Sequence, residues 1–177
     1  SLSIKPVEEW RPTTVAKARM RIERSEWDLL GPELVKRKMA KPLTHSQLVY
    51  HNGRPLLNGA SGVGKEKYVK CNKTSEQLEV LRLIINLVPS NDLQIPITGD
   101  VVTLLHFGQW QSLELLDNEV LVWDSEDIEC AFYVFSLPDD WLPWFALDLP
   151  LPGRMVGCND DEPRYLAISV VPTWWLS

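Results

Sequence analysis

The stretch Asp127-Ile-Glu-Cys-Ala-Phe-Tyr-Val-Phe135 decides how the fold of this chain is interpreted. It places an aspartate at the end of an extended, partly apolar run, and aromatic residues follow within a few positions. Alternate side chains of a strand share a face, so Asp127 and Glu129 would point one way and Ile128 the other. Carboxylate oxygens are ligands that Mg²⁺ prefers. The stretch therefore predicts a metal ligand at a strand end, and the plainer alternative is an aspartate in a surface turn.

Composition places the chain among ordinary globular proteins. Its 177 residues are 45% hydrophobic and 24% charged, which suits one domain with its own core. No run reaches the roughly 18 apolar residues of a membrane span, and Ser1–Lys5 lacks the apolar core of a signal peptide. The absence of an initiator Met predicts a piece of a longer protein. The 3 cysteines have no metal-site spacing, so we expect an intracellular, reducing compartment and no membrane partner.

The charge of the chain is unevenly distributed. The formal net charge of -6 counts against a free-standing nucleic-acid binder, which usually has a basic footprint. Acidic residues dominate between positions 114 and 162, whereas basic residues crowd the first quarter. This basic group is either a solvated helix face or a surface that meets phosphate, and both interpretations stay open. Its members are Lys17, Arg19, Arg21, Arg24, Lys36, Arg37, Lys38 and Lys41.

Periodicity and turn signals predict an α+β fold. Residues 15–39 are expected to be helical, in two pieces broken at Gly31-Pro32. Asn52-Gly53 is the strongest short signal for a type I′ hairpin turn. Helices and strands mix without strict βαβ alternation, which favours α+β. The apolar stripe of the helical region is Trp27, Leu30, Leu34, Val35 and Met39. The other expected elements are a buried strand at Leu78–Val88, a short helix at Gly99–Phe107, and strands at Val120–Trp123 and Tyr165–Val171.

A glycine-rich stretch, Gly59–Lys65, matches the phosphate-binding pattern GxxxxGK. Glu66 stands where a Ser or Thr would bind Mg²⁺. A true phosphate-binding loop also needs a buried strand before it and a helix after it, and here the flanking residues are short or polar. Val120–Asp124 could serve as the second strand of such a site. A P-loop nucleotide-binding protein that uses Gly59–Lys65 is therefore kept as an alternative function.

Three blocks of the sequence, in order, resemble a reverse transcriptase of the retroelement type, an RNA-directed DNA polymerase. Arg82–Asn91 resembles a block of the polymerase fingers. Asp127–Phe145 resembles the palm motif with a metal aspartate, Ala131-Phe132 and a Leu-Pro-Asp-Asp turn. Val170–Trp175 resembles the entry to the next palm motif. The resemblance covers residues 25–177 and implies a right-hand polymerase fold, with a lead-in at 1–24, fingers at 25–98 and a partial palm at 99–177.

The resemblance implies a role for each of five residues. Asp127 would be the carboxylate ligand of the catalytic Mg²⁺, and the backbone carbonyl of Ile128 would bind the same ion. Phe132 would be the steric gate that leaves no room for a ribose 2′-OH. Arg82 and Lys65 would hold the triphosphate of the incoming dNTP, since a guanidinium fork suits phosphate oxygens. The implied reaction is two-Mg²⁺ nucleotidyl transfer on an RNA or DNA template–primer.

The sequence also departs from this family. The Tyr-x-Asp-Asp block that supplies the remaining metal carboxylates is not present, so the isolated chain is predicted not to polymerise. The acidic run Asn159–Glu162 precedes the last block and is interpreted as a solvated loop. Asn86, Val88 and Trp174 stand where the family usually has Asp, Arg and Gly. These departures leave open a third function, that of a non-catalytic retroelement remnant that serves as an interaction module.

Overall fold

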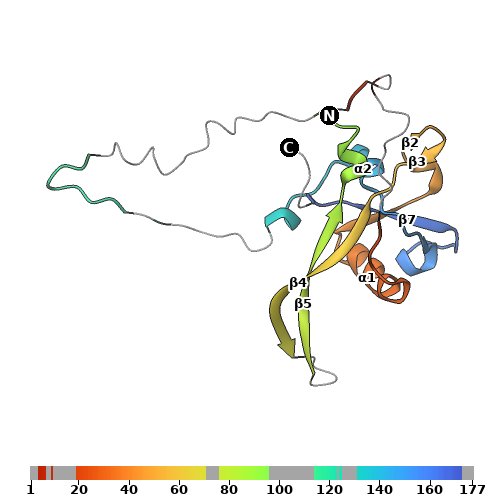
Figure 1. The fold of residues 1–177 in the computed structure, drawn as a ribbon, viewed down its shortest axis with the longest axis horizontal. Helices are drawn as coiled ribbons and strands as arrows, with labels where there is room; N and C mark the ends of the chain where they lie inside the picture. The colour runs from red at the N-terminus through yellow and green to blue at the C-terminus, as the bar shows by residue number, and fades with distance from the viewer. Residues whose placement is uncertain are drawn as a thin grey trace.

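The computed structural model describes residues 4–6, 9, 19–70, 76–95, 114–122, 124 and 131–172 (Figure 1). Helices and antiparallel strands alternate irregularly within these ranges, which confirms the expected α+β class. The α-helices are α1 (Arg24–Lys36) and α2 (Val88–Asn91). The 3₁₀ helices are η2 (His45–Gln47), η5 (Ala131–Tyr133), η6 (Asp139–Phe145) and η7 (Gly153–Val156). The strands are β1 (Ala40–Leu43), β2 (Tyr50–His51), β3 (Arg54–Pro55), β4 (Gly59–Lys70), β5 (Gln77–Asn86), β6 (Leu151–Pro152) and β7 (Pro163–Ile168).

Helix α1 presents an apolar stripe to the core, as its spacing predicts. The stripe consists of buried Trp27 and Leu34 and of partly buried Leu30 and Val35, and Met39 packs against the core from beyond the end of the helix. The helix is shorter than the expected 15–39, because residues 19–23 and 37–39 are not helical. The indole Nε1 of Trp27 donates a hydrogen bond of 2.8 Å to the carbonyl of Leu149, which lies 122 residues later in the chain. Tertiary packing and this bond, more than helix propensity, hold α1 in place.

The expected break at Gly31-Pro32 is wrong, because α1 continues through Pro32. A proline inside a helix removes one backbone hydrogen bond, which usually ends or kinks the helix. Packing offsets this loss. A Cβ placed on Gly31 would collide with the side chain of Leu151 and lie 3.1 Å from Leu166 Cδ1. The glycine therefore lets the helix approach the sheet closely, and the buried contacts keep its second half helical.

A three-stranded antiparallel sheet in the order β1–β7–β6 joins early and late parts of the chain (Figure 1). On one side of β7, Ala40 pairs with Ile168. On the other side, Leu151 pairs with Arg164. The strand expected at Tyr165–Val171 is confirmed for its first four residues, which belong to β7.

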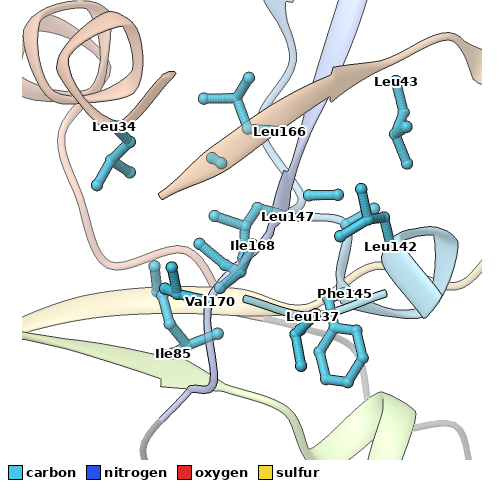
Figure 2. Packing of buried hydrophobic residues seen from close by; sticks show 14 of the residues in the cluster. Leu34, Leu43, Ile85, Leu137, Leu142, Phe145, Leu147, Leu166, Ile168 and Val170 are labelled. Atoms are coloured by element: carbon cyan, nitrogen blue, oxygen red, sulfur yellow. The ribbon is translucent and has the colours of Figure 1, made fainter. Parts of the chain in front are cut away.

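The hydrophobic core lies around β7, where side chains from several elements meet (Figure 2). Leu166 and Ile168 of β7 meet Leu34 of α1 and Phe145 of η6. Phe145 and Leu147 are 0% exposed. Full burial of one such side chain stabilises the fold by about 1.5–3 kcal/mol. The core thus contains residues from both the expected fingers and the expected palm portions.

The short hairpin of β2 and β3 confirms the turn prediction. Asn52 and Gly53 have φ values of 49° and 71°, both in the left-handed region that a type I′ turn requires. Tyr50 pairs with Pro55 and His51 with Arg54, so the two-residue turn sets the register. Glycine carries no Cβ penalty at positive φ, and asparagine tolerates it better than most residues.

The long hairpin of β4 and β5 projects away from the core (Figure 1). Its pairing runs from Gly59 opposite Asn86 to Lys70 opposite Gln77. The expectation of a buried strand at Leu78–Val88 is correct for the strand and wrong for the burial. Ile85 near the base is buried, whereas Leu81 is 60% exposed. The apolar pattern does not report burial here because the distal half of the hairpin extends beyond the packed body.

Two other expectations have different outcomes. No strand forms at Val120–Val122, where the structure describes exposed residues without ladder pairing. Trp123 and the helix expected at Gly99–Phe107 lie outside the described residues. Within the described ranges, no helix is both long enough and apolar enough to cross a membrane.

Candidate nucleotide and phosphate site

The β4–β5 hairpin carries two of the residues expected to hold a triphosphate. Arg82 on β5 pairs with Val63 on β4, and Lys65 lies two residues further along β4. Both cations are exposed, and neither forms an ion pair with another residue in the described part of the chain. The hairpin therefore brings the two side chains onto neighbouring strands, where an anion in solvent can reach them.

A β-bulge lies next to Lys65. The register shifts between Gly64 and Tyr68, so that residues 65–67 lie opposite a single residue of β5. Glu66 has a φ of 54°, an uncommon conformation for a residue with a side chain. Bulges bend a strand and redirect its side chains. The direction of Lys65 relative to Arg82 is thus set by the bulge and does not follow from simple alternation.

The GxxxxGK stretch has the wrong conformation for a phosphate-binding loop. Residues 59–65 belong to strand β4, and no helix follows them before the described part of β4 ends at Lys70. In a P-loop, successive backbone N–H groups converge on phosphate. Here residues 59–64 pair with β5 instead.

A pocket of about 380 Å³ opens at the base of this hairpin, and we call it the hairpin-base pocket. Two arginines, one hydroxyl and two side-chain amides line it together with apolar residues, and no carboxylate is among the lining residues. The lining residues are Arg19, Arg21, Ser61, Ile84, Ile85, Asn86, Leu87, Val88 and Asn91. The pocket thus combines an apolar wall with a cationic rim.

The segment that carries both arginines is held against β4. The backbone N–H of Arg21 donates a 2.8 Å hydrogen bond to the carbonyl of Ala60, and Arg21 forms a parallel bridge with Ser61. A Cβ on Gly59 would collide with the backbone of Arg19. Glycine at position 59 therefore permits the close approach that brings the arginines to the pocket.

A buried polar network fixes the base of the hairpin to the body. Asn58, immediately before β4, is 0% exposed. Its side-chain Nδ2 donates to the carbonyls of Trp144 at 2.9 Å and Ala146 at 3.1 Å. Its backbone N–H also donates to Ala146, at 2.8 Å. The orientation of the hairpin relative to η6 is thus set by hydrogen bonds that the interior holds away from water.

The palm-type residues are only partly described. Asp127 and Ile128, the expected metal ligands, lie outside the described residues, as does Trp174. Phe132 lies in η5 and is 53% exposed. The neighbouring Tyr133 packs against the core and anchors this short helix. Among the residues that the structure describes, no three His, Cys, Asp or Glu side chains gather as a metal site.

The acidic run Asn159–Glu162 is an exposed loop, as expected, and two of its carboxylates also hold a buried arginine. Buried Arg164 donates to Asp160 at 2.7 Å and to Glu162 at 3.2 Å. Its hydrogen bonds to the Cys158 thiol and to Glu162 raise the pKa of Arg164 above its ordinary value. Two of the acids are therefore used to neutralise a buried arginine of β7, and this cluster is structural.

Sequence reasoning missed the hairpin-base pocket. The signal available was the pair of arginines two positions apart, Arg19 and Arg21, within the basic first quarter of the sequence. Their approach to β4 depends on a contact with Gly59 across 40 residues of chain, which no local pattern reports. Comparisons of the chain with protein-family models, with curated proteins and with solved structures found no match.

Proposed function

We propose that this chain is the fingers and partial palm of a retroelement-type reverse transcriptase. The observation that carries the proposal is the β4–β5 hairpin, which projects from the core with Arg82 and Lys65 on paired strands. The order of the three sequence blocks, at Arg82–Asn91, Asp127–Phe145 and Val170–Trp175, supports the same function.

In this function the hairpin holds the triphosphate of a dNTP. The guanidinium of Arg82 offers several N–H donors in a planar fork, and Lys65 adds a compact positive charge. Charge-assisted hydrogen bonds of this kind contribute about 1.5–3 kcal/mol each. Neither cation is neutralised by an ion pair within the described residues, so both are available to a phosphate ligand.

The remaining roles fall on the palm residues. Asp127 and the carbonyl of Ile128 are the proposed holders of Mg²⁺, which supplies charge stabilisation for nucleotidyl transfer. Phe132 is the proposed steric gate, and its exposed ring is open to contact with a sugar. Discrimination by a gate of this kind is steric, because an additional 2′-OH would overlap the ring. The template–primer, RNA or DNA, is the proposed partner.

Photo-crosslinking of labelled dTTP in the presence of template–primer and Mg²⁺ tests the proposal. Arg82→Ala is expected to reduce labelling at least about tenfold, because it removes a charge-assisted hydrogen bond to phosphate. Arg54→Ala removes the same charge from the β2–β3 hairpin and should leave labelling unchanged. Phe132→Ala should increase labelling by UTP relative to dTTP. Equal labelling of the native chain and Arg82→Ala would contradict the proposed function.

Two other results would favour the alternative functions. ATP binding that is lost in Lys65→Ala, and is indifferent to Arg82 and Asp127, would support a nucleotide-binding protein. Template–primer binding without any dNTP labelling would support the non-catalytic remnant. Primer extension is not expected from the 177-residue chain, because the sequence lacks the Tyr-x-Asp-Asp carboxylates. Extension by the purified chain would overturn that expectation.

A further inference from the structure

We propose that the hairpin-base pocket is a seat for one nucleotide of a single-stranded nucleic acid, with Arg19 and Arg21 holding its phosphate. The role of this seat next to a dNTP held by Arg82 rests on the proposed function. The preference of the pocket for a nucleotide is argued from its lining residues alone. The two arginines come from the segment before α1, and the opposite wall comes from β5 and α2.

The charge of the pocket favours an anion. Arg19 and Arg21 are both exposed, and neither forms an ion pair with a described residue. The lining residues include no Asp or Glu, so the pocket has a local charge of opposite sign to the chain as a whole. Guanidinium groups match phosphate oxygens in geometry and are less strongly hydrated than ammonium groups. A phosphodiester is therefore a better occupant of the rim than a neutral or cationic ligand.

The wall of the pocket favours a base or sugar next to that phosphate. Ile84, on the strand face that opens on the pocket, is partly buried, and its neighbours Ile85 and Leu87 are packed at 5% and 2% exposure, so the wall rests on a packed backbone and is pre-formed. The side chains of Asn86 and Ser61 add hydrogen-bonding groups that can meet base or sugar edges. A volume of about 380 Å³ lies at the small end of the range for ligand pockets. One nucleotide is the unit that such a space suits.

A single strand should bind this pocket more tightly than a duplex does. A paired base can enter a pocket only if it leaves its stack and its partner, which costs a few kcal/mol. An unpaired nucleotide does not have this cost. Arg82, Ile84 and Asn86 alternate along β5 and so share one face of the strand, and the last two line the pocket. A single strand seated in the pocket can therefore continue along this face toward Arg82.

Fluorescence anisotropy with a labelled oligo-dT single strand measures this binding on the whole 177-residue chain. The assay contains EDTA, so that it does not depend on the proposed Mg²⁺ site. The double variant Arg19→Ala/Arg21→Ala is expected to weaken binding at least about tenfold. It should also lower the slope of log K against log salt by about 0.7 for each phosphate that the protein no longer neutralises. Circular dichroism confirms that the variant is folded.

A charge-matched variant controls for net charge. Arg37→Ala/Arg54→Ala removes two arginines that do not line the pocket, and it should retain the native affinity. Equally weakened binding in the two double variants would overturn the proposal, because the effect would then be long-range electrostatics. Equal affinity for the single strand and for a blunt duplex of the same sequence would also overturn it. So would competition by free dTTP as effective as by the oligonucleotide.

The inference and the proposed function can fail separately. Loss of oligo-dT binding in Arg19→Ala/Arg21→Ala, with dTTP labelling indifferent to Arg82, would retain the seat and remove the polymerase. Labelling that depends on Arg82, with oligo-dT binding indifferent to Arg19 and Arg21, would retain the polymerase and remove the seat.

Discussion

Ser90 Oγ donates a hydrogen bond of 2.8 Å to Asn58 Oδ1, and both residues are 0% exposed. The bond joins α2 to the residue immediately before β4, across 32 residues. Ser90 Oγ also contacts the carbonyl of Trp144, which Asn58 Nδ2 reaches as well. The segments that contain Asn58, Ser90 and Trp144 are thus joined by one buried hydrogen-bond network. The position of the hairpin, and of any ligand group on it, depends on this network.

Replacement of Asn58 should destabilise the whole fold. Asn58→Ala removes three buried side-chain hydrogen bonds, to the carbonyls of Trp144 and Ala146 and to the Ser90 hydroxyl. A typical intramolecular hydrogen bond contributes about 1 kcal/mol net, so we expect the free energy of unfolding to fall by about 3 kcal/mol. Denaturant titration measures it. Asn118→Ala, at an exposed position, is the matched control and should change stability by less than about 0.5 kcal/mol. A similar small effect at Asn58 would refute the importance of the network.

Gly31→Ala should destabilise the protein, although alanine is the better helix former. At an exposed helical position this substitution would stabilise by about 1 kcal/mol. In α1 the new Cβ would collide with Leu151, so the helix or the leucine must move. Overpacking of this kind costs about 1–3 kcal/mol. Ser25→Ala on the exposed side of α1 should be neutral or stabilising in the same thermal melts. An increase in melting temperature for Gly31→Ala would contradict the prediction, because it would mean that Leu151 accommodates the added Cβ without cost.

Gly59→Ala tests the position of the arginine segment without any change of charge. The added Cβ would collide with the backbone of Arg19, so residues 19–21 must move away from β4. We expect oligo-dT binding to weaken about tenfold, because the displaced arginines no longer neutralise phosphate. Gly62→Ala on the same strand would place its Cβ 3.0 Å from the flexible end of Leu81, which can rotate away. Binding should survive Gly62→Ala; equal effects of the two substitutions would count against the proposed seat.

Acid should weaken α1 through Glu33. The hydrogen bond from Arg37, with Lys36 nearby, holds the pKa of Glu33 below its ordinary value of 4.5. The unfolded chain binds this proton more readily, so the stabilisation is present above pH 4.5 and is lost as pH falls through the folded pKa. The effect is small because both partners are exposed. Glu33→Gln should flatten the fall in melting temperature below pH 4.5. Ser25→Ala, which changes no titratable group, should keep the native acid slope.

The sequence predicted those elements whose signals are local. Asn52-Gly53 demands positive φ at both positions, and the structure has it. The apolar spacing around Trp27 and Leu34 marks the buried side of α1 correctly. Local reasoning failed where packing overrides propensity, as at Pro32, and where an apolar run has no body to pack against, as at Val120–Val122.

The candidate site divides in the same way. Arg82 and Lys65 could be singled out from their residue types and their order, but their pairing on one hairpin depends on the register of β4 and β5. The bulge beside Lys65 appears only when the two strands are matched residue by residue. The hairpin-base pocket required the approach of Arg19 to Gly59, a contact between separate segments.

By itself, the sequence determined the α+β class, the tight turn and the residue types that can meet phosphate, because these depend on local conformation and on side-chain chemistry. The tertiary structure decided which of those residues come together. Close approach at Gly31 and Gly59, and the buried Asn58–Ser90 bond, place α1, the arginine segment and the hairpin relative to one another. Such contacts join residues that are far apart in the sequence, and local sequence patterns do not show which distant residues will meet.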